Sequence, residues 1–161
     1  MDLKKSEEYI ATHRFETIKH LCHYLSTDTL LFWSEETELK DCQQKTWQPI
    51  FDMLKSTFNL DLKKTISLMP ADNKESEQIF EKLLNMLSDK ELTACFLAAS
   101  EMKSVLLGLL LAKQKITVSE AFAAAFLEEL YQNLFWGKDV AAVNAQNQSK
   151  KELEKIAEYL N

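Results

Sequence analysis

The residues best suited to chemistry by type and spacing are the histidines, which all fall in the first predicted helix. Because a helix turns by about 100° per residue, they form one polar stripe with a nearby glutamate. Imidazole and carboxylate groups bind zinc, so a metal-dependent enzyme is one hypothesis. The pattern H-E-x-x-H is missing, and a solvated surface opposite the apolar face is the simpler interpretation. We expect no metal at this stripe, which consists of His13, Glu16, His20 and His23.

Nucleophilic catalysis has little support in the sequence. G-x-S-x-G is missing and no histidine follows His23, so a cysteine enzyme would need a base from the first helix. Cys22 and Cys95 have apolar neighbours, which favours buried small side chains, and the odd total with Cys42 suggests no disulfide framework. We predict no catalytic residue, no cofactor and no enzymatic activity.

A segment near the C-terminus, residues 127–137, combines acids, aromatic side chains and amides. Its adjacent acids diverge by about 100° on a helix and so do not form a shared-proton pair. Aromatic rings beside carboxylates are typical of protein-interaction surfaces. The alternative is that the aromatics belong to the core and the acids form its solvated edge, as is common for aromatics at helical spacing.

Composition indicates which kind of fold positions these residues. The chain has 161 residues, 46% of them hydrophobic, with only two Gly and two Pro, so one helical domain with a real core is expected. A net charge of −6 argues against nucleic acid as a partner. The longest apolar run, residues 105–112, is shorter than the ~20 residues of a membrane span. The first residues do not resemble a targeting sequence.

Apolar periodicity and capping signals predict most of the elements as helices. They are expected at residues 6–24, 34–46, 48–58, around 79–87, 88–113, 121–136 and from 149 onward, with a linker at 144–148. Short runs between turn residues predict a two-stranded β element formed by Thr29–Trp33 and Lys63–Leu68. The predicted fold class is therefore mainly α: a single helical domain with a small two-stranded β element.

Six motifs in order resemble segments of one protein family. They are Tyr24–Thr29 (Y-L-D-T-D-T in the family), Lys45–Ile50 (K-x-W-D-P-I), Thr65–Pro70 (T-x-G-I-M-P), Met102–Ser104 (L-K-S), Ile116–Ala121 (L-T-V-E-Q-A) and Leu127–Gly137 (L-E-E-E-Y-Q-x-x-x-W-G). The family they resemble is that of the assembly chaperones that bind the α subunit of the F-type ATP synthase catalytic head. Leu130 and Lys138 stand where the family has acids.

The resemblance implies a non-enzymatic chaperone that shields the β-subunit-facing surface of the unassembled α subunit. The implied anchors and charge partners for the α subunit are Glu128, Glu129, Tyr131, Gln132, Phe135 and Trp136. Lys103 and Asp28 are candidate structural residues or members of an ion pair, with Lys103 expected opposite Glu128 or Glu129. The implied location is the mitochondrial matrix in a eukaryote or the cytoplasm in a bacterium.

Other members carry a small N-terminal β domain, for which no segment precedes the first predicted helix. We therefore expect residues 1–161 to form the helical chaperone domain alone. Two other functions stay open: a helical adaptor that binds another protein through the same aromatic segment, and the metal-dependent enzyme. The sequence does not indicate the oligomeric state.

Overall fold

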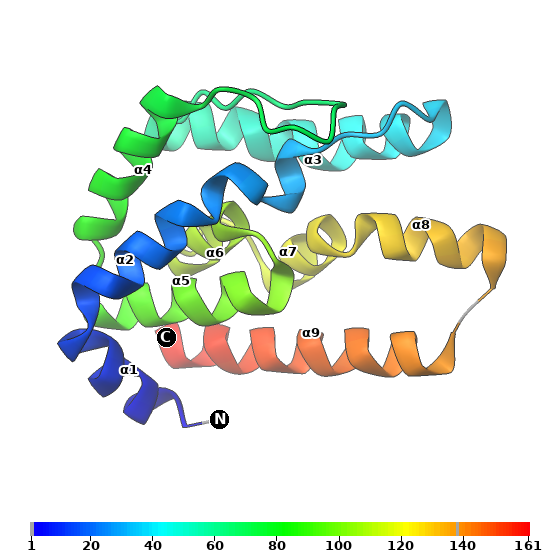
Figure 1. Cartoon of the computed structure of the whole chain (residues 1–161). Coiled ribbons are helices and arrows are strands. Elements are labelled where there is room, and N and C mark those ends of the chain that lie inside the picture. The colour runs from blue at the N-terminus through cyan, green and yellow to red at the C-terminus, as the bar shows by residue number, and fades with distance from the viewer. Residues whose placement is uncertain (1, 138) are drawn as a thin grey trace.

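The computed structural model describes residues 2–137 and 139–161, and this part of the chain is almost entirely helical (Figure 1). The α-helices are α1 (Leu3–Thr12), α2 (Arg14–His23), α3 (Thr37–Phe58), α4 (Lys74–Asn85), α5 (Asp89–Met102), α6 (Val105–Ala112), α7 (Val118–Ala125), α8 (Leu127–Trp136) and α9 (Val140–Leu160). Two short 3-10 helices, η1 (Leu25–Thr27) and η2 (Thr29–Leu31), connect α2 to α3. None of the described helices is long and apolar enough to cross a membrane.

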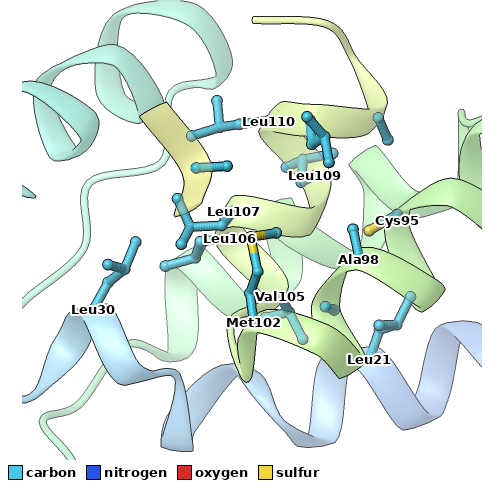
Figure 2. Packing of buried hydrophobic residues seen from close by; sticks show 14 of the residues in the cluster. Leu21, Leu30, Cys95, Ala98, Met102, Val105, Leu106, Leu107, Leu109 and Leu110 are labelled. Atoms are coloured by element: carbon cyan, nitrogen blue, oxygen red, sulfur yellow. The ribbon is translucent and has the colours of Figure 1, made fainter. Parts of the chain in front are cut away.

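The core is built around α6, the most apolar helix of the chain. Every residue of α6 is buried, and α5, α2 and η2 contribute side chains around it (Figure 2). Gly108 lies against α5: a Cβ added there would be 2.6 Å from the carbonyl oxygen of Cys95. A glycine therefore allows the α5 and α6 backbones to approach closely.

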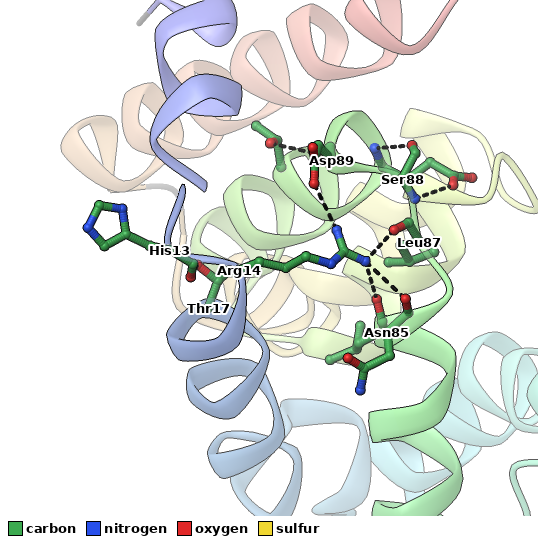
Figure 3. A network of polar contacts seen from close by, with 10 residues as sticks. His13, Arg14, Thr17, Asn85, Leu87, Ser88 and Asp89 are labelled. Carbon is green, nitrogen blue, oxygen red and sulfur yellow. Dashed lines mark hydrogen bonds and ion pairs between the residues drawn. The ribbon is translucent and has the colours of Figure 1, made fainter. Parts of the chain in front are cut away.

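Arg14 joins the start of α2 to the end of α4. Its guanidinium pairs with Asp89 at 3.0 Å and donates to the carbonyl oxygens of Leu84, Asn85 and Leu87 (Figure 3). The last carbonyls of a helix have no partner within the helix, and the cation satisfies them here. The single helix expected at residues 6–24 is in fact two, because the chain turns at His13.

Several helix boundaries differ from the prediction. The two helices expected at 34–46 and 48–58 form one continuous helix, α3. Pro49 has no backbone N–H, so one carbonyl oxygen in the preceding turn lacks its helical donor. The helix continues because Pro49 is exposed and this carbonyl lies near solvent. The linker expected at 144–148 lies inside α9. Conversely, the helix expected at 88–113 breaks at Lys103, whose φ of 54° is left-handed, and the helix expected at 121–136 breaks at Phe126.

The predicted two-stranded β element is wrong. Thr29–Leu31 forms the 3-10 helix η2, and the described residues contain only one isolated parallel bridge, between Phe32 and Thr65. Thr65 donates to Leu31 and accepts from Trp33, both at 2.8 Å. The two segments therefore meet as predicted, but the Asp28 side chain accepts from Leu30 N and bends the first one into a helical turn.

Helices α8 and α9 run in opposite directions, with α8 between α3 and α9, and the end of α8 reaches beyond the other helices (Figure 1). The far half of α9, which carries Leu153 and Ile156, packs on α5. In contrast, α8 has no buried residue. Gly137 is the C-cap of α8 at the end of this hairpin, and its positive φ of 81° is one that glycine adopts readily.

Candidate functional site: the α8 and α9 surface

The hairpin end presents large apolar side chains to solvent. Leu134, Phe135, Trp136 and Val140 are exposed to 81%, 58%, 87% and 73% and are called the apolar tip below. The alternative that Phe135 and Trp136 are ordinary core residues is therefore wrong. Monomeric proteins seldom leave such residues together in water, and where they do, the surface is commonly a site of interaction. Leu134 lies in the segment 127–137 that its composition had singled out, although it was not predicted as a site residue, whereas Val140 lies outside that segment.

Glu128 lies at the base of α8 and is only half-exposed. Its carboxylate accepts a hydrogen bond from Gln43 Nε2 at 3.2 Å, and the fully buried Gln43 also accepts from the backbone N–H of Ser34. Burial raises the pKa of Glu128, the hydrogen bond from Gln43 lowers it, and the neighbouring Glu129 raises it further. The acid is thus held in place by α3. No pattern in the sequence indicated Gln43 as its partner.

Glu129 lies about 100° further around α8 than Glu128 and faces α9. Its Oε2 atom accepts from Nε2 of the buried Gln146 at 2.9 Å. Glu129, Gln132 and Trp136 line a cleft of about 520 Å³ between α8 and α9. Glu128 and Glu129 also line a groove beside Lys103. The structure therefore brings Gln132 and Trp136 together with Glu129, whereas Glu128 lies in the adjoining groove.

Tyr131 is part of the link between α8 and the beginning of α3. Its hydroxyl donates to Glu36 at 2.7 Å and lies 3.3 Å from a carboxylate oxygen of Glu38. The hydrogen bond to Glu36 and the two negative charges raise the pKa of Tyr131 above its ordinary value. The Tyr131 ring lies 4.9 Å from that of Phe135, so the tyrosine supports the base of the apolar tip. Lys138, where the family has an acid, lies outside the described residues.

Asp28 is buried at the start of α6. It accepts from the backbone N–H groups of Leu30 and Leu106 and from the Ser104 hydroxyl, each at 2.9 Å. A carboxylate in this position satisfies the free donors of a helix N-terminus. Burial raises the pKa of Asp28 to about 6, and these hydrogen bonds oppose the rise.

Lys103 is close to Asp28 through its backbone. Its carbonyl oxygen accepts from the backbone N–H and the hydroxyl of Thr29, while its side chain is exposed. None of the ion pairs within residues 2–137 and 139–161 includes Lys103, Asp28 or Glu128. No ion pair among the described residues thus joins Lys103 to Asp28, Glu128 or Glu129. Asp28 instead has a structural role, with its oxygens on neutral donors.

The histidine stripe does not form a ligand cluster. His13 lies at the turn before α2, whereas His20 and His23 lie on α2 itself. The His13 ring stacks on Tyr9, with ring centroids 4.0 Å apart. His20 and His23 lie beside Tyr24. No group of three or more potential ligands suited to a metal ion exists among the described residues. Burial raises the pKa of the Cys95 thiol to about 12 and contributes most to raising that of Cys22 to about 11, so neither is an activated nucleophile.

Comparison with known proteins indicates which family the sequence resembles. The family model described as "ATP12 chaperone protein" matches residues 1–55. The mitochondrial protein atp12 of Schizosaccharomyces pombe is 29% identical over 160 residues, which cover 92% of this chain and 51% of the relative. The chain is similar in sequence to ATP12 chaperones. The family resemblance inferred from the motifs is thereby confirmed.

Solved structures of bacterial relatives share the helical fold. Atp12 from Paracoccus denitrificans superposes with a TM-score of 0.88 at 21% identity, covering 96% of this chain and 67% of that one. The Atu1473 protein of Agrobacterium tumefaciens gives 0.84 at 23% identity, covering 94% of this chain and 57% of that one. The chain thus spans about half the length of the curated ATP12 relative and little more than half to two thirds of these structures.

Proposed function

We propose that this chain acts in assembly of the F-type ATP synthase by binding the unassembled α subunit and shielding its β-subunit-facing surface. The observation that carries the proposal is the apolar tip, in a chain similar to the ATP12 chaperones. Its Leu134, Phe135 and Trp136 are exposed on α8, a helix with no buried residue. An unassembled subunit exposes apolar surface that promotes aggregation. Covering that surface requires binding and no bond-making step, so the proposed role is non-enzymatic.

The tip and the acids have different tasks in this interface. Trp136 and Phe135 supply rigid apolar area at the exposed end of the hairpin. Glu128 and Glu129 supply negative charge near its base, where charge pairs set register and association rate. An interface with a few anchors and moderate area can be displaced when the β subunits arrive. The proposed site of action is the mitochondrial matrix or the bacterial cytoplasm.

The first experiment removes one anchor. Trp136→Ala should weaken α-subunit binding by about 2 kcal/mol or more, roughly thirtyfold, as truncating an aromatic hot spot does. Stability should change little, because Trp136 is 87% exposed. The readouts are co-elution with an isolated α subunit and suppression of its light scattering on dilution from denaturant.

Phe15→Ala is the matched control, since Phe15 is also an exposed aromatic but lies on α2. Its binding should equal that of the unmodified chain. Equal loss in both variants, or none in Trp136→Ala, would remove the apolar tip from the interface. If the unmodified chain neither binds nor protects the α subunit, the adaptor hypothesis with another partner replaces the chaperone.

The second experiment separates the charge of Glu128 from its hydrogen bond. Glu128→Lys should weaken α-subunit affinity by a few kcal/mol, the scale for a close interfacial charge that loses its partner. It also breaks the bond from Gln43, whereas Glu128→Gln keeps an oxygen for that bond and removes only the charge. Both variants should therefore bind less tightly, and only Glu128→Lys should unfold earlier.

The control for this pair is Glu154→Lys, at an exposed position on α9. The measurements are thermal unfolding and titration with the α subunit. Full affinity of a folded Glu128→Gln variant would show that Glu128 is a structural acid and does not bind the partner.

A further inference from the structure

A second concave surface lies away from the α8 and α9 hairpin. The C-terminal half of α2 and the turn between α5 and α6 enclose a pocket of about 380 Å³, here called the α2/α5 pocket. The residues that define it are His20, Leu21, Tyr24, Phe96, Ser100 and Lys103. Its volume is at the lower end of the range for ligand sites in proteins.

The walls of the α2/α5 pocket are apolar and aromatic. The centroid of the His20 ring lies 4.8 Å from that of Tyr24 and 5.6 Å from that of Phe96, so three aromatic rings form one wall of the pocket. Leu21 and Ala99 lie among the lining side chains and are buried. A single large apolar side chain of a ligand would bury its surface against these walls and displace water. The free energy gained is proportional to the apolar area buried.

The charge of the α2/α5 pocket differs from that of the chain. The protein has a net charge of −6, yet no Asp or Glu lines this pocket, and Lys103 lies at its edge. The Lys103 ammonium is in none of the ion pairs among the described residues, while its backbone is held by Thr29. The hydroxyls of Ser100 and Thr27 add polar groups at the rim.

We propose that the α2/α5 pocket binds an apolar side chain of a protein segment in which an acidic residue is the neighbour of that side chain. The apolar residue contacts the rings of Tyr24 and Phe96, and the adjacent carboxylate pairs with Lys103. The Ser100 and Thr27 hydroxyls donate to the carbonyl oxygens of Phe96 and Tyr24, so at the rim their oxygens can only accept. A peptide suits this rim better than an apolar small molecule does, because its backbone N–H groups can donate to these oxygens. The α2/α5 pocket lies apart from the apolar tip and shares only Lys103 with the groove of Glu128 and Glu129. The proposal does not depend on the α-subunit proposal.

The test is a titration of the ¹⁵N-labelled full chain with blocked peptides, followed by amide chemical shifts. The probe is acetyl-Gly-Phe-Asp-Gly-amide, compared with the same peptide carrying Lys in place of Asp or Ser in place of Phe. Saturable shifts are expected at the amides of Tyr24, Ser100 and Lys103. Replacing Asp by Lys should weaken binding about fivefold, the effect of one exposed charge pair, and replacing Phe by Ser should abolish it.

Variants of the chain complete the test. Lys103→Gln should weaken binding of the Asp peptide about fivefold and leave the Lys peptide unaffected. Lys115→Gln removes an equally exposed cation outside the pocket and should change neither. Ser100 is exposed, so a tyrosine in its place can fill the pocket without disturbing the core. Ser100→Tyr should abolish peptide binding, and the amide spectrum outside the pocket should remain that of the folded chain.

Three results would overturn the proposal: no saturable shifts at the pocket, equal affinity for the Asp and Lys peptides, or equal effects of Lys103→Gln and Lys115→Gln. Phenylacetate that binds as tightly as the Asp peptide would also overturn it, since the occupant would then be a small carboxylate. None of these results depends on whether the α subunit binds.

Discussion

At the scale of single residues, the absence of a side chain at Gly108 decides how closely α5 and α6 pack. Helix propensity alone predicts that Gly108→Ala stabilises the protein by about 1 kcal/mol. The added Cβ would instead lie 2.6 Å from the Cys95 carbonyl oxygen and 3.1 Å from the Ala99 Cβ, so we expect a loss of about 1–3 kcal/mol. Urea unfolding distinguishes helix propensity from packing, because the two predict opposite signs for the change in the free energy of unfolding.

The buried carboxyl of Asp28 should make stability depend on pH. Its pKa is about 6 when folded and near the ordinary 3.8 when unfolded, so the protonated form is favoured by folding. Its contribution is complete below about pH 3.8 and is lost as the pH rises through 6. The stability of the unmodified chain relative to Asp28→Asn should therefore fall by about 3 kcal/mol between pH 4 and pH 7.

Urea unfolding of both proteins at several pH values measures this difference. Asp41→Asn, at an exposed position, serves as the control and should give a difference nearly independent of pH. If the stability difference between the unmodified chain and Asp28→Asn also does not change with pH, the Asp28 carboxyl has the same pKa in the folded and the unfolded state.

At the scale of elements, local signals predicted where helices begin better than where they break. Ser88 with Glu91 and Thr117 with Glu120 form the two capping boxes expected from the sequence. At the break after Lys103, Ser104 is the local N-cap of α6, and its hydroxyl accepts from Leu107 N. The start of α6 also donates to Asp28, which is 75 positions away from Lys103 in sequence. Such a contact leaves no pattern within a window of sequence, so it could not be predicted.

The candidate site shows the same division between local and distant information. Composition left two interpretations of residues 127–137 open, an interaction surface and a core stripe with a solvated edge, because it does not separate exposed aromatics from core ones. Exposure of Phe135 and Trp136 follows from how α8 extends beyond the core. The partners of the acids, Gln43 and Gln146, come from α3 and α9 and required the fold.

A helix without buried residues should open more easily than the core helices. Amide hydrogen exchange in α8 is therefore expected to be much faster than in α6, where every residue is buried. Exchange followed by mass spectrometry or NMR measures this contrast. Addition of the α subunit should slow exchange in α8 and leave α6 unchanged. Equal protection of α8 and α6 in the free chain would contradict the arrangement.

At the scale of the whole molecule, the last turns of α9 contact the first helix of the chain, α1, as well as α5. The Tyr159 hydroxyl bonds to Glu7 on α1, and Lys90 lies 4.9 Å from the Tyr159 ring centroid. Ile156→Ala should therefore lower the stability of the entire fold by about 2–5 kcal/mol, as a buried cavity does. The exposed Glu154→Ala should change it by less than about 0.5 kcal/mol.

Chemical unfolding followed by circular dichroism tests this expectation. One shifted transition in Ile156→Ala would show that α9 belongs to the cooperative unit. An unchanged midpoint, with only a sloping baseline, would mean that the end of α9 frays independently of the core.

The three tryptophans of the chain fall into two optical classes. Trp33 and Trp47 are buried, with ring centroids 5.9 Å apart, whereas Trp136 stands in solvent at the apolar tip. Emission from the buried pair should lie to the blue and resist iodide quenching, and emission from Trp136 should lie to the red and be quenched. The molecule therefore carries its own unlabelled fluorescent reporter at the proposed interface, with an internal reference in the core.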